Sequence, residues 1–312
     1  MAISLALPDD RPVHVEPGQT LLEALRQADV PIVHACGGHA RCSTCRVRVV
    51  AGIASCTPRT QDEQRMAERI GLEDAIRLAC QTRIHGDVTV RRLVLDPEDT
   101  ELTRQFKSRT TSASMGREAH VAVLFADVEG FTHLTEILPA YDVVHVLHRW
   151  FHQATAVIEA HGGRVDNYMG DGLLAVFQRP EAEAAAAAVF AGLGLLDVAS
   201  AVGAYFGAAY AQGFAARVGV HAGTVVVGSP TPWHREHDTV IGDVVNVASR
   251  IEAANKELGT RLLVSDVVLA RVASLVRTGR RAELEIRGKS GLHTLVEVLG
   301  RTEDLGGGND AD

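Results

Sequence analysis

The 312-residue sequence contains few lysines. Only three of its 31 basic residues are lysines, Lys107, Lys256 and Lys289, so few positions could supply a lysine's chemistry. Residues 198–216 carry no charge, but they are mostly Ala and Gly with Ser, Gln and Tyr, and are far less apolar than a membrane-spanning helix. We interpret them as a helix end, a loop of small residues and the start of a strand.

The first residues also lack the basic start and apolar stretch of a signal peptide. We therefore expect a soluble, cytoplasmic protein with no membrane partner. The net charge of −8 argues against a nucleic-acid partner, because such binders rely on basic side chains to neutralise phosphates. The length allows two domains of ordinary size, and a hydrophobic content of 46% is enough to build their cores.

Five cysteines, all within the first 80 residues, do not form an even set of disulfides, so a metal or redox cofactor explains them better. Cys36, Cys42 and Cys45 have the spacing C-x5-C-x2-C, and Cys80 follows after 34 intervening residues. Four thiolates can hold a [2Fe–2S] cluster, and the loop glycines permit backbone N–H groups to turn toward the sulfurs. Zinc is the rival, but two evenly separated C-x2-C pairs are missing.

The fifth cysteine, Cys56, is interpreted as a small buried thiol, with a spare ligand or redox sensor as the alternative. His34 and His39 are interpreted as loop histidines, because four cysteines already suffice as ligands.

The segments around the cysteines fit a β-grasp domain. Helices are predicted after the capping boxes that begin at Thr20 and Thr60. Strands are predicted at 2–6, 13–16, 46–50, 76–80 and 87–94. The cysteine spacing is similar to the adrenodoxin type of [2Fe–2S] ferredoxin, and residues 1–95 resemble such a domain throughout.

Two later segments, 40 residues apart, each run from an apolar strand to a carboxylate beside glycine. Asp127 precedes Gly130, and Asp171 lies between two glycines. Carboxylates at neighbouring strand ends can share two Mg²⁺ ions about 3.5–4 Å apart, an arrangement that serves in-line attack on phosphorus. Gly130 allows a tight turn whose N–H groups face phosphate oxygens. Two ordinary strand–turn junctions are the alternative for either segment alone.

A third segment, residues 239–250, weighs against that alternative. Asn246 and Arg250 are four residues apart and share one face of a predicted helix. An amide and a guanidinium on one face suit a ribose and a charged phosphoryl group. In order and spacing the three segments resemble the class III nucleotidyl cyclases, the adenylyl and guanylyl cyclase catalytic domain, from about Val121 to Val298.

The resemblance implies a role for each site residue. Asp127, Asp171 and the carbonyl of Val128 would bind two Mg²⁺ or Mn²⁺ ions, Asn246 would hold the ribose, and Arg250 would stabilise the transition state. The resemblance also implies a two-fold homodimer, in which the aspartates of one chain face Asn246 and Arg250 of the other.

Substrate contacts are where the sequence departs from the family. Asn167 stands where adenylyl cyclases usually have Lys and guanylyl cyclases Glu, whereas Thr239 matches bacterial adenylyl cyclases. ATP is the predicted substrate. Arg287 or Lys289 would reach the terminal phosphates in place of the usual lysine. The remaining residues assigned to substrate binding end the first segment: Phe131 and Thr132.

The C-terminal half is predicted to be an α+β domain at 119–300, with a polar linker at 96–118 and a flexible tail at 301–312. The resemblance implies that this domain is a ferredoxin-like α/β sandwich. Its predicted helices span 139–160, 181–199 and 243–257. Its predicted strands span 120–126, 163–178 as a hairpin, 217–221, 224–228, 261–264 and 293–298. His145, His148 and His152 share a face of the first helix, where a solvent or interface role is favoured over metal binding.

These features together predict an adenylate cyclase that converts ATP to 3′,5′-cyclic AMP and pyrophosphate. The iron–sulfur domain would regulate it through linker 96–118, with an electron donor as a further partner. One alternative is a guanylate cyclase or a cyclase of relaxed specificity. The other is an electron-transfer ferredoxin whose second half is a non-catalytic, nucleotide-sensing dimerisation module.

Overall fold

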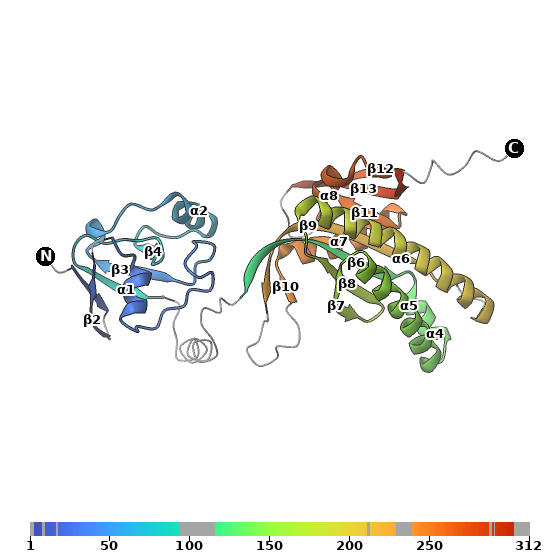
Figure 1. Ribbon diagram of the computed structural model, residues 1–312, viewed down its shortest axis with the longest axis horizontal. Helices are drawn as coiled ribbons and strands as arrows, with labels where there is room; N and C mark the ends of the chain where they lie inside the picture. The colour runs from blue at the N-terminus through green and yellow to red at the C-terminus, as the bar shows by residue number, and fades with distance from the viewer. Residues whose placement is uncertain are drawn as a thin grey trace. The chain divides into compact units, whose positions relative to one another are not determined.

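A computed structural model describes residues 3–7, 10–16, 18–93, 116–210, 213–228, 239–286, 289 and 291–302 (Figure 1). The chain divides into two compact units, with the boundary between Arg117 and Glu118. Most of the predicted linker 96–118 and tail 301–312 lie outside the described residues. The strand that leads into the second unit begins at Arg117, the last residue before this boundary and inside the predicted linker, and the last described strand ends at Arg301.

The first unit is a five-stranded sheet packed against helices, as the β-grasp prediction requires. Its elements are β1 Ile3–Leu7, β2 Asp10–Val15, α1 Leu21–Gln27, β3 Arg46–Ala51, the 3₁₀ turn Ile53–Ser55, α2 Gln61–Ile70, β4 Ile76–Leu78 and β5 Val88–Arg92. The strand order is β2-β1-β5-β3-β4, with β1 and β5 parallel and the other neighbours antiparallel. Apolar residues of α1 and of the central strands fill one core beneath the cysteine-bearing loop.

The two predicted capping boxes differ in the structure. At α1, Thr20 accepts from the Glu23 N–H, and the Glu23 carboxylate accepts from the Thr20 N–H at 2.7 Å, so the box is complete. At α2, Thr60 caps the helix by accepting from the Glu63 N–H. The Glu63 carboxylate does not return to Thr60, because it is buried and binds Arg77 and the Leu78 N–H instead. The sequence therefore predicted the N-cap at Thr60 correctly, but the predicted return bond from the Thr60 N–H to the Glu63 carboxylate was wrong.

The second unit contains an eight-stranded sheet with helices on both faces. Its elements are β6 Arg117–Val128, α4 Phe131–Ile137, α5 Ala140–Ala160, β7 Arg164–Met169, β8 Gly172–Phe177, α6 Glu181–Tyr210, β9 Ala216–Gly228, β10 Thr239–Ile241, α7 Asp243–Leu258, β11 Leu262–Ser265, α8 Asp266–Val272, β12 Val276–Glu285 and β13 Leu292–Arg301. The strand order is β12-β13-β11-β9-β6-β8-β7, and β10 pairs with β9.

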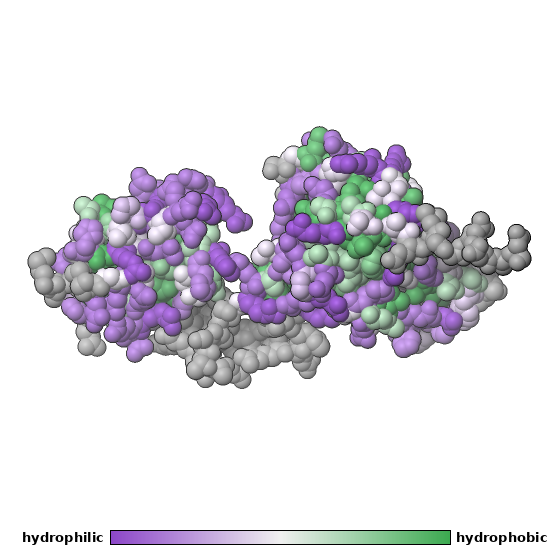
Figure 2. Space-filling view, turned by 45° about the horizontal axis from the view of Figure 1, so that its top comes forward, coloured by the Kyte–Doolittle hydropathy of each residue, from purple (hydrophilic) through white to green (hydrophobic). Residues whose placement is uncertain are grey.

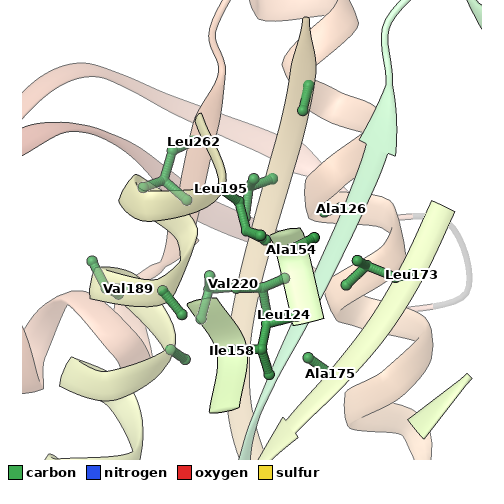
Figure 3. Packing of buried hydrophobic residues seen from close by; sticks show 14 of the residues in the cluster. Leu124, Ala126, Ala154, Ile158, Leu173, Ala175, Val189, Leu195, Val220 and Leu262 are labelled. Atoms are coloured by element: carbon green, nitrogen blue, oxygen red, sulfur yellow. The ribbon is translucent and has the colours of Figure 1, made fainter. Parts of the chain in front are cut away.

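Alternate residues of the central strands supply two separate cores. On β6, Leu124 and Ala126 pack with α5 and α6, whereas Val121 and Val123 pack with β10 and α7. Figure 3 shows the first of these cores, where side chains from α5 and α6 meet those from β6, β8, β9 and β11. Because side chains alternate across a strand, burial on both faces explains why residues 121–126 of β6 are all apolar.

Helix α6 is longer than predicted, because it continues to Tyr210 instead of ending at 199. Its glycines allow close approach: a Cβ on Gly194 would lie 2.8 Å from Val157 of α5, and one on Gly203 would lie 2.6 Å from the Phe214 carbonyl. Among the described residues there is one helical stretch, Glu181–Gly207, that is long enough and apolar enough to cross a membrane by length and composition alone. Half of its apolar segment is buried inside the protein.

Candidate functional sites

Asp127 and Asp171 lie together at one end of the sheet. Asp127 is near the end of β6, and Asp171 is in the two-residue turn between β7 and β8. Gly170 adopts a left-handed φ of 64°, which lets the turn close tightly. Gly172 brings the hairpin close to β6, since a Cβ there would lie 3.1 Å from Asp127 Oδ1. The two predicted metal ligands therefore come from neighbouring strands and are adjacent in space.

The electrostatics of this pair favour a cation. Burial and the neighbouring Asp127 carboxylate, which also shares a hydrogen bond with it, raise the pKa of Asp171 to about 6. Two carboxylates this close repel each other when both are ionised, and a bound cation would remove the repulsion. Mg²⁺ commonly takes one or two carboxylates and completes its shell with water and substrate phosphates. The residues present fit such an ion.

Glu252, which the sequence analysis did not single out, belongs to the same electrostatic cluster. It lies on α7, and burial together with the charges of Asp127 and Asp171 raises the pKa of its carboxyl to about 7, against the opposing effect of Arg217. Arg217 also donates to Glu129, at 2.5 Å. A glutamate two positions after a candidate arginine has no sequence signature of its own, so only the folded chain reveals it.

Asn246 and Arg250 lie on one side of α7, as their spacing predicted. Asn246 is exposed and Arg250 half-buried, while Val247 and Ile251 turn into the core. Residues 250 and 252 are separated by about 200° around a helix. Glu252, the α7 side chain that acts on the aspartates, therefore lies on the opposite side of the helix from Arg250.

The predicted base contacts lie on β7 and β10. Asn167 is exposed on β7, and Thr239 begins β10. The Thr239 hydroxyl donates to the Asp166 carboxylate at 2.7 Å, and Arg164 donates to the same carboxylate at 2.5 Å. Asp166 is a site residue that the sequence analysis missed, although it immediately precedes Asn167.

The remaining predicted substrate residues are only partly described. Phe131 is half-buried at the start of α4 and packs against the core, and Thr132 beside it is exposed. Lys289 forms an ion pair with Asp243, the first residue of α7. Arg287 lies outside the described residues.

In the first unit, the four predicted thiols form two contacting pairs, Cys36 with Cys42 and Cys45 with Cys80. Two cysteines on each of two irons is the ligand set of a [2Fe–2S] cluster. Backbone N–H groups of residues 38, 39 and 41 donate to the sulfur of Cys36, and that of Ala40 donates to Cys80. Gly37 and Gly38 have left-handed φ values of 73° and 100°, which the loop needs for this arrangement. The residues fit the cluster.

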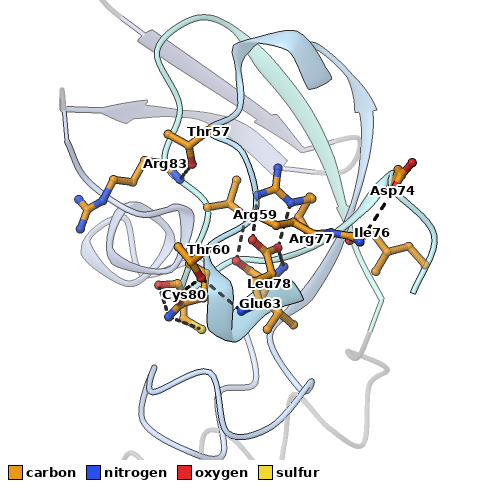
Figure 4. Close-up of polar contacts among 12 residues, drawn as sticks. Thr57, Arg59, Thr60, Glu63, Asp74, Ile76, Arg77, Leu78, Cys80 and Arg83 are labelled. Atoms are coloured by element: carbon orange, nitrogen blue, oxygen red, sulfur yellow. Dashed lines mark hydrogen bonds and ion pairs between the residues drawn. The ribbon is translucent and has the colours of Figure 1, made fainter. Parts of the chain in front are cut away.

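Side-chain contacts hold the cysteine-bearing segments in place. Thr44 accepts from the Ala35 N–H at 2.9 Å and lies 3.1 Å from Cys42 Sγ. The segment before Cys80 is fixed by Glu63, which accepts two bonds from Arg77 and one from the Leu78 N–H (Figure 4). Arg77 and Glu63 expose only 5% and 1% of their side chains, so this is a buried ion pair.

The other residues weighed as ligands lie elsewhere. Cys56 directly follows the 3₁₀ turn Ile53–Ser55 and is buried, as expected of a small core thiol. His34 binds the Ile32 carbonyl, and His145 contacts the Tyr205 hydroxyl at 3.3 Å. Among the described residues, no three His, Cys, Asp or Glu side chains converge on one metal position.

Comparison with known proteins assigns both units to families. Residues 113–297 match the adenylate and guanylate cyclase catalytic domain, and residues 6–85 match the 2Fe-2S iron-sulfur cluster binding domain. The chain is similar to adenylate cyclase 1 of Rhizobium meliloti (strain 1021), with 34% identity over 183 residues, or 58% of this chain and 27% of that protein. The chain thus spans about a third or less of the curated relatives that it matches.

Solved structures agree on the fold of the second unit. The guanylyl cyclase Cya2 is 28% identical with a TM-score of 0.56, and the match covers 60% of this chain and 95% of that chain. The adenylyl cyclase CyaB from P. aeruginosa is 24% identical with a TM-score of 0.54, covering 59% of this chain and 95% of that one. The α+β fold predicted for this unit is confirmed.

Proposed function

The chain belongs to the adenylate and guanylate cyclase catalytic domain family, and we propose that it is an adenylate cyclase that converts ATP to 3′,5′-cyclic AMP and pyrophosphate. The observation that carries the proposal is the contacting pair Asp127 and Asp171, whose mutual repulsion calls for a cation at the end of the sheet. Asp127, Asp171 and the Val128 carbonyl would hold Mg²⁺ or Mn²⁺. When bound, these ions acidify the ribose 3′-OH and neutralise the triphosphate.

The other site residues orient the substrate and stabilise charge. In the reaction the 3′ oxygen gives up its proton to solvent water and forms a bond to the α-phosphorus. At the same time the bond from that phosphorus to the bridging oxygen breaks, and pyrophosphate leaves. Asn246 would fix the ribose, and Arg250 would donate to the α-phosphoryl oxygens, where negative charge builds up. Removing such a donor typically lowers the rate by about 10²–10³-fold.

We propose that the active enzyme is a homodimer with two shared sites. The support is on α7, where Arg250 lies on the side of the helix away from the aspartates of its own chain. The exposed apolar residues of the unit include three on the strands that carry the predicted base contacts: Tyr168 and Met169 on β7 and Ile241 on β10. Apolar side chains are visible among hydrophilic ones on the surface in Figure 2. A partner chain would bury such surface and bring its own Arg250 to the triphosphate.

For the base, ATP is favoured by the curated relatives named adenylate cyclase, at 34% and 28% identity. A guanylate cyclase is the second candidate, because the chain is also similar to the guanylyl cyclase Cya2, and Asn167 has neither of the usual identities. An Asn167→Lys variant that gains activity on ATP and loses it on GTP would support the base contact assigned to this position.

The deciding experiment is production of cyclic nucleotide by the purified chain from ATP and from GTP, with Mg²⁺ and with Mn²⁺. We expect cyclic AMP to form faster, and Asp127→Asn and Asp171→Asn each to abolish it. Glu257→Gln, an exposed carboxylate on α7, is the matched control and should retain full activity. No cyclic nucleotide from either substrate would favour the electron-transfer alternative with a non-catalytic second half.

We further propose that the iron–sulfur domain regulates the cyclase and is not a participant in its chemistry, since phosphoryl transfer needs no electrons. A change of redox state can shift activity only if the two cluster states bind the cyclase differently. Cyclase rates of oxidised, reduced and cluster-free protein, prepared anaerobically, test this point. Equal rates in all three forms would remove the regulatory role.

A further inference from the structure

Asp166 is a buried carboxylate that the proposed chemistry does not use. Its side chain is only 2% exposed, while the side chain of Asn167 next to it is exposed. Burying a carboxylate is costly unless its oxygens accept hydrogen bonds, so the partners of Asp166 define what it does.

A β-bulge sets this orientation. Along the β7–β8 pair, Arg164 faces Val176 and Val165 faces Ala175, but Asn167, not Asp166, faces Leu174. Asp166 is thus the extra residue of β7, and a bulge re-aims side chains at such a point. The bulge turns Asp166 inward to β10 and leaves Asn167 on the outside, beside the predicted base position.

Each Asp166 oxygen accepts from a different donor. Oδ1 accepts from the Arg164 guanidinium at 2.5 Å, and Oδ2 accepts from the Thr239 hydroxyl at 2.7 Å. A threonine hydroxyl has one hydrogen to donate and two lone pairs to accept with. Because Asp166 takes the only hydrogen, the Thr239 oxygen can offer nothing but acceptor sites to any further partner.

We propose that Asp166 is a specificity-positioning residue, which holds the Thr239 hydroxyl as an acceptor and so selects a purine with an amino group at C6. The inference rests on the proposed function and on the sequence-based prediction that Thr239 contacts the base. Adenine carries a donor amino group at C6, whereas guanine and hypoxanthine carry an acceptor oxygen there. An acceptor held toward C6 binds the first and repels the others.

Asn167 cannot make this distinction alone. Its amide has both a donor and an acceptor, and a rotation of the amide exchanges them. It can therefore pair with the edge of either purine, which leaves discrimination at C6 to a group whose polarity is fixed. Thr239 is such a group for as long as its hydroxyl donates to Asp166.

The test replaces Asp166 by Asn, which has the same shape. Arg164 only donates, so it will retain the amide oxygen and force the amide NH₂ toward Thr239. The NH₂ then donates to the Thr239 oxygen, and the hydroxyl hydrogen is released toward the base. We expect the ratio of kcat/KM for ATP to that for ITP to fall roughly ten-fold or more, since one hydrogen bond changes from matched to mismatched. ITP differs from ATP around C6 and lacks the 2-amino group of GTP.

A double variant supplies the matched control. In Asp166→Asn with Arg164→Met, nothing fixes the amide oxygen, so the amide can turn and accept from Thr239 again. We expect this variant to recover most of the ATP preference. An unchanged ratio in the single variant, or an equal fall in single and double variants, would overturn the proposal. A loss of rate with both nucleotides at a constant ratio would show a structural role only, and would overturn it too.

Binding separates this inference from the proposed function. Competition of ATP and ITP against a fluorescent nucleotide can be measured on wild type and both variants without turnover. Absence of cyclic nucleotide from the wild type would remove the cyclase assignment. The Asp166 inference would still be tested by binding. It predicts that the preference for ATP over ITP falls in the single variant and returns in the double variant.

Discussion

At the scale of single residues, the Glu63–Arg77 pair is where stability and cofactor binding meet. Both side chains are almost fully buried, and the Glu63 carboxylate also accepts from the Leu78 N–H at 2.7 Å. Leu78 ends β4, two residues before the fourth thiol, Cys80. The pair therefore fixes the backbone that presents Cys80, from a helix that carries no ligand itself.

Removal of the Glu63 carboxylate should lower the stability of the first unit and make it lose its cluster faster. In Glu63→Ala, Arg77 remains as an uncompensated buried charge, which costs roughly 3–5 kcal/mol. We expect a clear fall in the unfolding midpoint of this unit and faster loss of visible absorbance with a chelator. Glu68→Gln, on the exposed side of α2, is the control. A double variant with Met at both 63 and 77 should recover much of the stability, which would not happen if Glu63 acted only by capping α2.

Thr44 should tune the reduction potential of the cluster. When Cys42 is a ligand its sulfur accepts, so the Thr44 hydroxyl donates to it while accepting from the Ala35 N–H. A hydrogen bond to a ligand sulfur favours the more negative, reduced cluster. Thr44→Ala should lower the midpoint potential by roughly 20–60 mV, the equivalent of one net hydrogen bond in a one-electron couple. Redox titration measures it. Thr44→Ser, which keeps the hydroxyl, should stay near wild type, and an equal shift in both variants would contradict the assignment.

At the scale of elements, the contact between β9 and α7 sets the position of Arg250, the arginine proposed to act in catalysis. A Cβ on Gly219 of β9 would lie 2.2 Å from the Glu252 nitrogen and 2.7 Å from the Ala248 carbonyl. Both are backbone atoms of α7, so no side-chain rotation can relieve the clash. The helix that carries Asn246 and Arg250 rests directly on this glycine.

Gly219→Ala should therefore displace α7 and reduce catalysis more than it affects the first unit. Overpacking of this kind costs about 1–3 kcal/mol, and a shift near 1 Å in a catalytic group can cost about 10²-fold in rate. We expect a large fall in kcat with an unchanged cluster spectrum. Gly213→Ala, where a Cβ meets nothing within 4 Å, is the control. A Gly219→Ala enzyme with normal kcat would show that α7 tolerates the shift.

The elements that the sequence predicted well are those with a strong local pattern. The hairpin at β7–β8, the start of α7 and the helix α5 follow turn glycines or apolar spacing. The short helices α4 and α8 and the strand β12 were missed. Helix α4 and strand β12 contain few apolar residues, and α8, although mostly apolar, has only 7 residues and so shows no clear helical period. The single strand β9 was predicted as two strands. Its buried side chains up to Ala222 stand at even-numbered positions and face one core, whereas those from Val225 on stand at odd-numbered positions and face the other core.

The residues of the candidate sites also fall into two groups, those with a local sequence pattern and those without one. The carboxylates, cysteines and α7 residues stand in motifs whose spacing carries the chemistry, so the sequence alone located them. Asp166, Glu252 and the Glu63–Arg77 pair depend on contacts between residues 14 to more than 70 positions apart. Such contacts follow from a β-bulge, a helix face or a buried partner, and none of these has a local signature.

At the scale of the whole molecule, the proposed homodimer requires each chain to contribute one half of each of two sites. Glu252 and the aspartates act on one another within a chain, and Arg250 points to the other side of the same helix. If a two-fold axis relates two chains, the aspartates of each will face Arg250 of the other, and each dimer will contain two composite sites. A shared site predicts that two inactive variants can restore each other.

Mixing Asp127→Asn with Arg250→Ala chains tests this geometry directly. Each variant alone should be inactive, because every one of its sites lacks one essential group. In a heterodimer one site combines the intact aspartate of one chain with the intact arginine of the other, while the second site has neither. Random exchange at equal amounts puts half of the chains in heterodimers with one working site of two, so activity should reach about a quarter of wild type.

Asp127→Asn mixed with Asp171→Asn is the control and should stay inactive, because both changes fall in the same half-site. A mixture of the first two that remains inactive, although exchange is proved with tagged chains, would place both halves of the site within one chain.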